Sequence, residues 1–188
     1  MGRRLDSTFC SGCYRGTVEP ATIANKVDAD EAGALTMTSK GLGPIDSTTK
    51  ATLANLRALL AGYEVRPVND GSLEYDIFKD GERLAYVVPD DQSGYVFNVH
   101  VVSSHVAVHG YPWRVGRAFG DWAHLTTCEC WGPNPTCYAS GEHLAVNFDR
   151  ACEGLTGGDR SALRELDGLI VQRVIWSPSA FGGDGDGG

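Results

Sequence analysis

The sequence predicts an α+β domain in which an antiparallel β-sheet meander carries two helices packed on one face. Leucines recur at helical spacing early in the chain, and segments rich in β-branched and aromatic residues follow one another through its middle. Short polar turns separate these segments, and turns of that length join antiparallel neighbours. One face of the sheet is expected to pack on the helices while the other faces solvent.

The first elements are a strand and a helix. Residues 33–43 predict a strand that runs into a Gly-rich turn. Ser47 or Thr48 provides a side-chain oxygen that can cap the free N–H groups at the start of a helix, and Gly62 is a suitable helix end. Four leucines between them fall on one helical face, which we expect to be buried: Leu53, Leu56, Leu59 and Leu60.

Further strands follow along the chain. Their β-branched and aromatic content predicts four of them, over residues 63–68, 73–78, 83–88 and 95–102. Asp80-Gly81 is a strong signal for a two-residue hairpin turn between two of these strands. The remaining predicted elements are a second, shorter helix over 118–125, a strand over 143–148, a helical turn over 161–166 and a final strand over 169–176.

The ends of the chain differ in composition from its middle. The length of 188 residues is enough for one domain with flanking tails. Residues 1–32 are polar and lack a sustained period, which is typical of a signal remnant or a tether to a lipid anchor. We therefore expect a single domain over residues 33–178, followed by a disordered Gly/Asp tail over residues 179–188.

The charge balance excludes some classes of partner. The formal net charge is −8, and the sequence contains no basic stripe that would neutralise phosphates. Nucleic acid and anionic membrane surfaces are therefore not expected as partners. No apolar run approaches the roughly 20 residues of a membrane-spanning helix, so we expect membrane contact only through a lipid anchor.

The N-terminal segment contains one candidate anchor. Ser11-Gly12-Cys13 has the small-small-Cys ending of a bacterial lipoprotein signal, in which the cysteine becomes lipidated. A secretion signal also needs about 7–15 apolar residues before that ending, and the residues before Cys13 do not supply them. Two interpretations stay open: the recorded start lies inside a longer signal, or the match is chance.

Four cysteines lie in the expected domain and favour two disulfides. Cys130 and Cys137 flank a Gly-Pro-Asn-Pro turn, so we expect them to face each other on paired strands, near the ~5.5 Å Cα separation of a disulfide. Cys128 would then pair with Cys152. Cys128 and Cys130 are a poor pair, because strand residues two apart lie about 7 Å from each other.

Zinc is the alternative interpretation of the cysteines. Cys128, Cys130 and Cys137 could bind a metal together with His100 or His105. Structural zinc sites usually show two well-spaced pairs, a pattern that this cluster lacks. We therefore favour disulfides and expect neither a metal nor another cofactor.

No residue pattern predicts catalysis. Ser103 and Ser104 lie near His105, but the chain contains no Gly-x-Ser-x-Gly elbow. The carboxylates lie mainly in turns, where aspartate accepts local backbone N–H bonds. We expect no catalytic residue and no enzymatic activity. A hydrolase whose site is scattered among loops remains an alternative.

The order of elements resembles a known family. GLGPIDSTT leads into a helix, LEYDIFKDGERLAYVV forms a hairpin, and YVFNVHVVSS is followed by WRVGRAFGDW. A cysteine pair, Cys130 and Cys137, precedes HLAVNF, and VQRVIW closes the domain. These features, from about residue 33 to 177, resemble the RpoE-regulated lipoprotein family of unknown function, a YfeY-like family.

The resemblance implies an envelope lipoprotein of a Gram-negative bacterium, held in the periplasm by a lipidated N-terminal cysteine, for which Cys13 is the matching position. Cys128 and Cys152 depart from the family pattern and suggest an additional bridge. The family has no established activity to carry over. We therefore expect a non-enzymatic periplasmic domain with a role in envelope stress or in binding another envelope protein. Its lipid anchor would be compatible with attachment to the outer membrane.

Overall fold

The computed structural model describes residues 34–68, 73–120, 125–131, 133–152 and 168–182, all within one compact unit, Gly33–Gly188. These ranges contain one helix, α1 (Leu53–Leu59). Their strands are β1 (Thr36–Thr38), β2 (Gly41–Leu42), β3 (Glu64–Pro67), β4 (Tyr75–Lys79), β5 (Glu82–Pro89), β6 (Val96–Val101), β7 (Ala107–Val108), β8 (Thr127–Trp131), β9 (Asn134–Tyr138), β10 (Leu144–Phe148) and β11 (Val171–Trp176).

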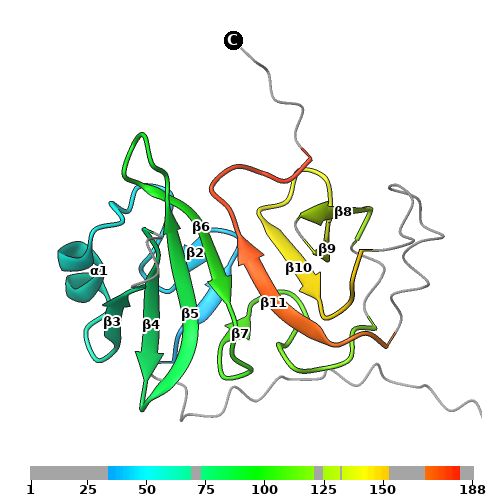
Figure 1. Cartoon of the computed structure of the whole chain (residues 1–188), viewed down its shortest axis with the longest axis horizontal. Coiled ribbons are helices and arrows are strands. Elements are labelled where there is room, and N and C mark those ends of the chain that lie inside the picture. The colour runs from blue at the N-terminus through cyan, green and yellow to red at the C-terminus, as the bar shows by residue number, and fades with distance from the viewer. Residues whose placement is uncertain (1–33, 69–72, 121–124, 132, 153–167, 183–188) are drawn as a thin grey trace, which may run out of the picture. The chain divides into compact units, whose positions relative to one another are not determined.

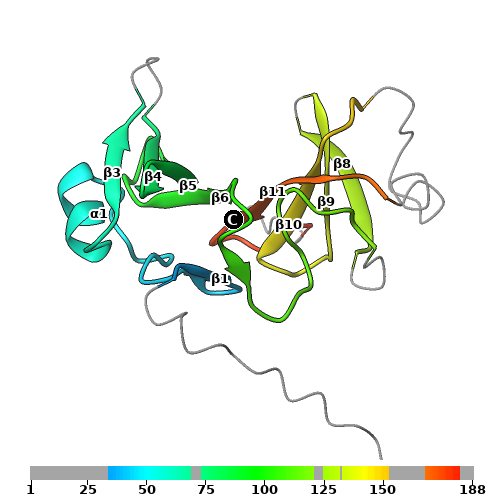
Figure 2. The same cartoon turned by 90° about the horizontal axis from the view of Figure 1, so that it is seen from below.

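The described strands form two sheets. The larger sheet has eight strands in the order β3-β4-β5-β6-β11-β10-β9-β8, and every neighbouring pair in it is antiparallel. The pair β6–β11 forms its middle. β11 therefore joins the meander β3–β6 to the strands β10, β9 and β8 (Figures 1 and 2). The smaller sheet has the order β2-β1-β7, with β7 parallel to β1.

The predicted meander is confirmed. β4 and β5 are joined by the two residues Asp80 and Gly81, whose φ angles of 52° and 83° are both positive. Two positive φ angles are the requirement of a type I′ hairpin turn, which Asp-Gly satisfies at little cost. In the turn between β5 and β6, the Asp90 carboxylate accepts the N–H groups of Gln92 and Ser93 at 3.0 and 2.6 Å. Those bonds stabilise the ionised form and hold the pKa of Asp90 below its usual value.

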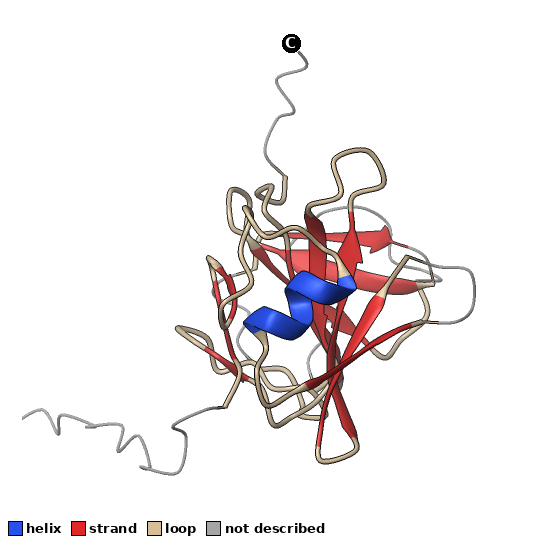
Figure 3. Ribbon diagram, turned by 90° about the vertical axis from the view of Figure 1, so that its left-hand side faces the viewer, coloured by secondary structure: helices blue, strands red, loops and turns tan. Residues whose placement is uncertain are grey.

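Helix α1 covers part of the main core. Leu56 in the helix and Leu60 at its C-cap are buried, and Leu53 packs against the core while partly buried. Leu59 is 37% exposed, so the predicted face is correct except at that residue. The helix begins later than predicted, because Thr52 provides the N-cap and accepts the N–H of Asn55. Ser47 and Thr48 instead lie in the preceding turn. Figure 3 shows α1 in front of the strands, and it contacts β3.

The predicted α+β class is wrong. The described residues are mostly β-strand, with one short helix and two sheets, whereas the prediction placed two helices on one sheet face. The second helix was expected over 118–125. Ala118 instead forms an antiparallel bridge with Ile170, and the N–H of Phe119 donates to the carbonyl of Leu169 at 2.8 Å. Tertiary pairing with the chain before β11 therefore overrides the local helical pattern in the described part of that segment, residues 118–120 and 125.

The larger sheet buries side chains on both faces. Val87, Val99 and Trp176 form one cross-strand row within the main core, which also includes side chains of the small sheet and α1. The opposite face carries a second, smaller apolar cluster: Tyr138, Ala145, Ile175 and Phe181.

Phe181 belongs to a segment predicted to be a disordered tail. Its side chain is 6% exposed, and its backbone N–H donates to the carbonyl of Glu142 at 2.8 Å. The packed region therefore extends past the predicted boundary at residue 178, through at least Phe181. Residues 183–188, the predicted turn over 161–166 and the predicted tether over 1–32 lie outside the described ranges.

Candidate functional site

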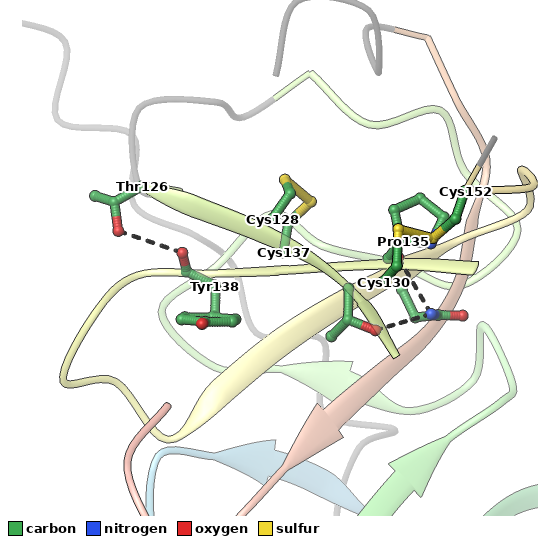
Figure 4. The surroundings of a disulfide bond; sticks show 9 residues. Thr126, Cys128, Cys130, Pro135, Cys137, Tyr138 and Cys152 are labelled. Atoms are coloured by element: carbon green, nitrogen blue, oxygen red, sulfur yellow. Dashed lines mark hydrogen bonds between the residues drawn. A yellow bond between two sulfur atoms is a disulfide. The ribbon is translucent and has the colours of Figure 1, made fainter. Parts of the chain in front are cut away.

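Two disulfides hold the hairpin formed by β8 and β9. Cys128 is bonded to Cys137 with a Cα–Cα distance of 4.0 Å, and Cys130 is bonded to Cys152 with a Cα–Cα distance of 5.9 Å. Figure 4 shows the first bond crossing between the paired strands and the second joining β8 to the chain after β10. All four cysteines of the described part are therefore oxidised, as the sequence predicted.

The predicted connectivity of these disulfides is wrong, because the turn lies one residue earlier than expected. Cys128 faces Cys137 in the β8–β9 register, and Cys130 faces Pro135. Moving the centre of a hairpin by one residue shifts the pairing of its strands by two. Cys137 is therefore opposite Cys128, and Cys130 is left to reach Cys152, whose N–H donates to the carbonyl of Pro133 at 2.9 Å.

The disulfides remove the ligands of the alternative metal site. A thiolate must be free to bind zinc, and the sulfur atoms of Cys128, Cys130 and Cys137 are bonded in pairs. His100 lies on β6, and His105 follows that strand. The described residues contain no group of three or more His, Cys, Asp and Glu side chains placed to hold a metal ion.

A buried amide supports the disulfide hairpin from the neighbouring strand. Asn147 on β10 is 2% exposed. Its side-chain nitrogen donates to the carbonyl of Pro135 and to the hydroxyl of Thr136, at 3.1 and 3.0 Å. Its side-chain oxygen accepts from Arg173 Nε at 3.1 Å. The amide is therefore satisfied on both sides, as a buried polar group requires.

Polar side chains continue from Asn147 across the face of the larger sheet opposite the main core. Tyr86, His100 and Ile175 form one cross-strand row there, and the rings of Tyr86 and His100 stack with centroids 4.4 Å apart. We call the polar residues of this region the outer-face cluster: Asp76, Arg83, Tyr86, His100, Asn147 and Arg173.

Two guanidinium groups link the outer-face cluster. Arg173 donates to the hydroxyl of Tyr86 at 2.8 Å as well as to Asn147, which joins β5 to β10 through β11. Arg83 forms an ion pair with Asp76 at 2.5 Å and lies over the ring of Tyr86, 4.8 Å from its centroid. Glu74 also acts on Tyr86, so the charges of the two arginines are opposed by those of two carboxylates, Asp76 and Glu74.

His100 is neutral in this environment. Burial lowers the pKa of its imidazole to about 3, and the charges of Arg173 and Arg83 act in the same direction. Its Nδ1 is buried and has no hydrogen-bond partner in the described part of the chain. A histidine with so low a pKa cannot carry a proton at neutral pH, and we interpret this one as a packed aromatic ring of the sheet.

Ser103, Glu82 and His105 meet at the end of the β5–β6 pair, but not as a catalytic triad. The Ser103 hydroxyl donates to Glu82 Oε1, and His105 Nδ1 lies 3.4 Å from Glu82 Oε2. In a triad the imidazole takes the proton of the hydroxyl. Here the carboxylate lies between the two other groups, and Ser103 is 4% exposed. The arrangement fixes the chain after β6 and does not activate a nucleophile.

Two hollows among the described residues were not predicted from the sequence. The first, about 270 Å³, has mainly apolar walls that include Trp113, Phe119 and Val171. The second, about 320 Å³, is lined mainly by residues with polar side chains, and we call it the polar pocket. It is lined by Thr38, Ser39, His109, Gly110, Tyr111 and Glu142. Nothing in the local sequence pattern indicated that these residues lie together.

Comparison with known proteins shows the fold. No protein-family model matches the chain, and no curated protein matches it in sequence. Among solved structures, the chain is similar to the crystal structure of the uncharacterised protein YfeY from Escherichia coli, with a TM-score of 0.56. The chain has the YfeY fold. The matched regions cover 76% of this chain and 99% of YfeY, with 18% identical residues, a level at which the likeness concerns the fold alone.

The YfeY likeness confirms the coarse part of the resemblance seen in the sequence. It covers nearly all of YfeY, so the shared architecture extends over a whole domain. The two disulfides seen among the described residues are compatible with a location outside the cytoplasm. In the described ranges, no helix combines the length and the apolar character needed to cross a membrane. Cys13, the predicted lipidation position, lies outside those ranges.

Proposed function

We propose that the chain is a disulfide-stabilised, non-enzymatic binding domain that works in the periplasm of a Gram-negative bacterium. The observation that carries this proposal is the oxidised state of all four cysteines in the described part of the chain. Disulfides persist in oxidising compartments and are rare in the cytosol of most organisms. The fold shared with a protein of Escherichia coli adds support for a bacterial setting, while the envelope location rests on the disulfides.

The interior of the domain favours binding over catalysis. The buried titratable groups of the outer-face cluster are engaged with one another, and His100 has a pKa too low for acid–base work near neutral pH. Ser103 donates its proton to a carboxylate rather than to an imidazole. Two roles fit such a domain. It binds another protein of the envelope, or it acts in the response to envelope stress.

The disulfide map tests the proposal directly. The protein is isolated from the envelope fraction of cells that produce it from its natural gene, alkylated without reductant, and cleaved after glutamate. This cleavage separates Cys128, the pair Cys130 and Cys137, and Cys152 into three peptides. The disulfides Cys128–Cys137 and Cys130–Cys152 would join all three peptides. The alternative disulfide Cys130–Cys137 would lie within one peptide, and Cys128–Cys152 would join the other two. Recovery of the four cysteines as alkylated thiols would refute the proposal.

A lipid anchor at Cys13 forms part of the proposal and has its own test. The protein is produced from its natural gene, including the sequence upstream of it. The cells are then labelled with an alkyne analogue of palmitate. We expect label on the wild-type protein and its loss in Cys13→Ser, with Cys10→Ser as the matched control that keeps it. Equal labelling of all three proteins, or labelling of none, would remove the anchor from the proposal and leave the binding domain.

A further inference from the structure

The polar pocket has the chemistry of a site for a small, neutral, hydroxyl-rich ligand. Its walls come from three separate parts of the chain. Thr38 and Ser39 lie at and just after the end of β1, His109 and its two neighbours follow β7, and Glu142 lies in the turn between β9 and β10. A volume of about 320 Å³ falls at the lower end of the range for ligand pockets and accommodates about one sugar ring.

Three side chains of the polar pocket have unused hydrogen-bonding capacity. Within the described part of the chain, the side chains of Ser39, His109 and Glu142 make no hydrogen bond and no ion pair. Together they offer a hydroxyl, an imidazole and a carboxylate, which can both donate and accept. Thr38 differs, because its hydroxyl accepts the N–H of Lys40 at 3.0 Å. The residues with unused side-chain groups therefore lie on all three walls of one pocket.

Backbone hydrogen bonds hold each wall in place. The N–H of His109 donates to the carbonyl of Met37 at 2.8 Å, which extends the β1–β7 pairing to the pocket. The indole of Trp176 donates to the carbonyl of Ser39 at 3.0 Å. The carbonyl of Glu142 accepts from Phe181 at 2.8 Å. Since the walls are fixed before a ligand arrives, binding requires little ordering of the protein.

The charges of the polar pocket select among ligand classes. Its lining contains one carboxylate, Glu142, and neither lysine nor arginine. Phosphates and carboxylates would therefore meet a negative group without compensation, in a protein whose net charge is already −8. A neutral polyol suits the mixture of donors and acceptors, and the Tyr111 ring provides an apolar wall beside them. A primary amine could pair with Glu142, but it would leave the donor groups of the pocket unused.

We propose that the polar pocket binds one ring of a neutral saccharide chain, through Ser39, His109 and Glu142. Ser39, His109 and Gly110 are exposed, so the pocket opens at the surface and a sugar chain can continue beyond it. This inference deepens the proposed function by naming a ligand class, and it rests on the domain being a binding module.

The test is a titration of the ¹⁵N-labelled full chain with linear tetrasaccharides of glucose and of N-acetylglucosamine. We expect at least one of them to shift the amide signals of all three pocket walls. Glu142→Ala and His109→Ala should each weaken that binding by tenfold or more, because each removes the hydrogen-bonding group of the side chain. Asp91→Ala, in an exposed turn, and His105→Ala, after β6, are the matched controls and should bind like wild type.

Other outcomes of the same titration overturn the inference. No shift at the pocket walls with any of the tetrasaccharides rejects it. The protein is also titrated separately with 1,5-diaminopentane and with inorganic phosphate. Shifts with the diamine alone would assign the pocket to an amine, and shifts with phosphate alone would assign it to an anion. Cleavage of a tetrasaccharide during the titration would instead contradict the non-enzymatic function. The envelope proposal is judged by the disulfide map, so either proposal can fail while the other stands.

Discussion

At His100, a neutral imidazole stacks on Tyr86, and the positive charges of Arg83 and Arg173 act on it. An isolated histidine would be about half protonated near pH 6.5. Burial and the two positive charges lower the pKa of this one to about 3. The sequence showed a histidine within a strand. It did not show that the ring of Tyr86 stacks on this histidine, or that Arg83 and Arg173 act on it. That environment arises from the register of three strands.

Acid should destabilise the fold through His100. Below pH 6.5 the unfolded chain binds a proton at this position and the folded protein does not, so stability is present above that pH and is lost as pH falls towards 3. The loss approaches about 1.4 kcal/mol per pH unit in that window. Urea unfolding at pH 7, 6 and 5 measures it. His100→Phe keeps a ring for stacking and should show a flatter dependence, whereas an unchanged slope would contradict the assignment.

At the scale of single elements, the β8–β9 hairpin shows the limits of sequence patterns. The presence of a turn between Trp131 and Asn134 and the oxidised state of the cysteines were predictable, because both depend on nearby residues. The connectivity was not, since it depends on which of two adjacent residue pairs occupies the turn. The register Cys128↔Cys137 then decides both bonds.

Removing either disulfide should reduce stability by about 2–4 kcal/mol. Cys130–Cys152 closes a loop with a sequence separation of 22, against 9 for Cys128–Cys137, so its loss should cost slightly more. Urea unfolding without reductant compares two variants, in which both cysteines of one disulfide are replaced by serine. One variant lacks Cys128 and Cys137, and the other lacks Cys130 and Cys152. A double variant of Cys10 and Cys13 is the control. Unchanged unfolding midpoints in both pairs would count against the bonds.

Helix α1 owes its stability to one buried face. Leu56 is fully buried, so Leu56→Ala should reduce the free energy of unfolding by about 2–5 kcal/mol through lost burial and an unfilled cavity. Leu59 on the same helix is 37% exposed, and Leu59→Ala should cost less than about 1 kcal/mol. Urea unfolding of the two variants measures the difference. Similar losses would mean that the helix packs through another face.

At the scale of the whole described unit, Trp176 connects the two sheets. It lies in β11, pairs with Val99 of β6 and Leu144 of β10, and donates its indole N–H to the carbonyl of Ser39 beside the small sheet. Its side chain is 1% exposed and belongs to the main core. One residue of the last strand therefore fixes part of the polar pocket, more than a hundred residues away in the chain.

Trp176→Phe should destabilise the protein by about 1–3 kcal/mol, because it removes both volume and the bond to Ser39. Trp113→Phe is the matched control. Trp113 is 3% exposed, but its indole nitrogen has no hydrogen-bond partner in the described part, so its replacement loses volume without a bond. Guanidinium unfolding compares the two variants. A larger loss for Trp113→Phe would show that the indole bond contributes little.

By itself, the sequence determined the features that depend on neighbouring residues. These are the strands of the meander, the turn at Asp80-Gly81, one helix through Leu56 and the oxidised state of the four cysteines. Each follows from backbone preference, side-chain period or the spacing of a few residues. The candidate disulfide residues were therefore predictable, while their pairing was not.

Only the tertiary structure decided how distant segments pair. β11 lies between β6 and β10, β7 runs parallel to β1, and residues 118–120 pair with the chain before β11 instead of forming a helix. The polar pocket depends on these pairings, because its walls come from three segments that are far apart in the sequence. Pairing between distant segments reflects burial summed over the whole core, and a local pattern does not contain that sum.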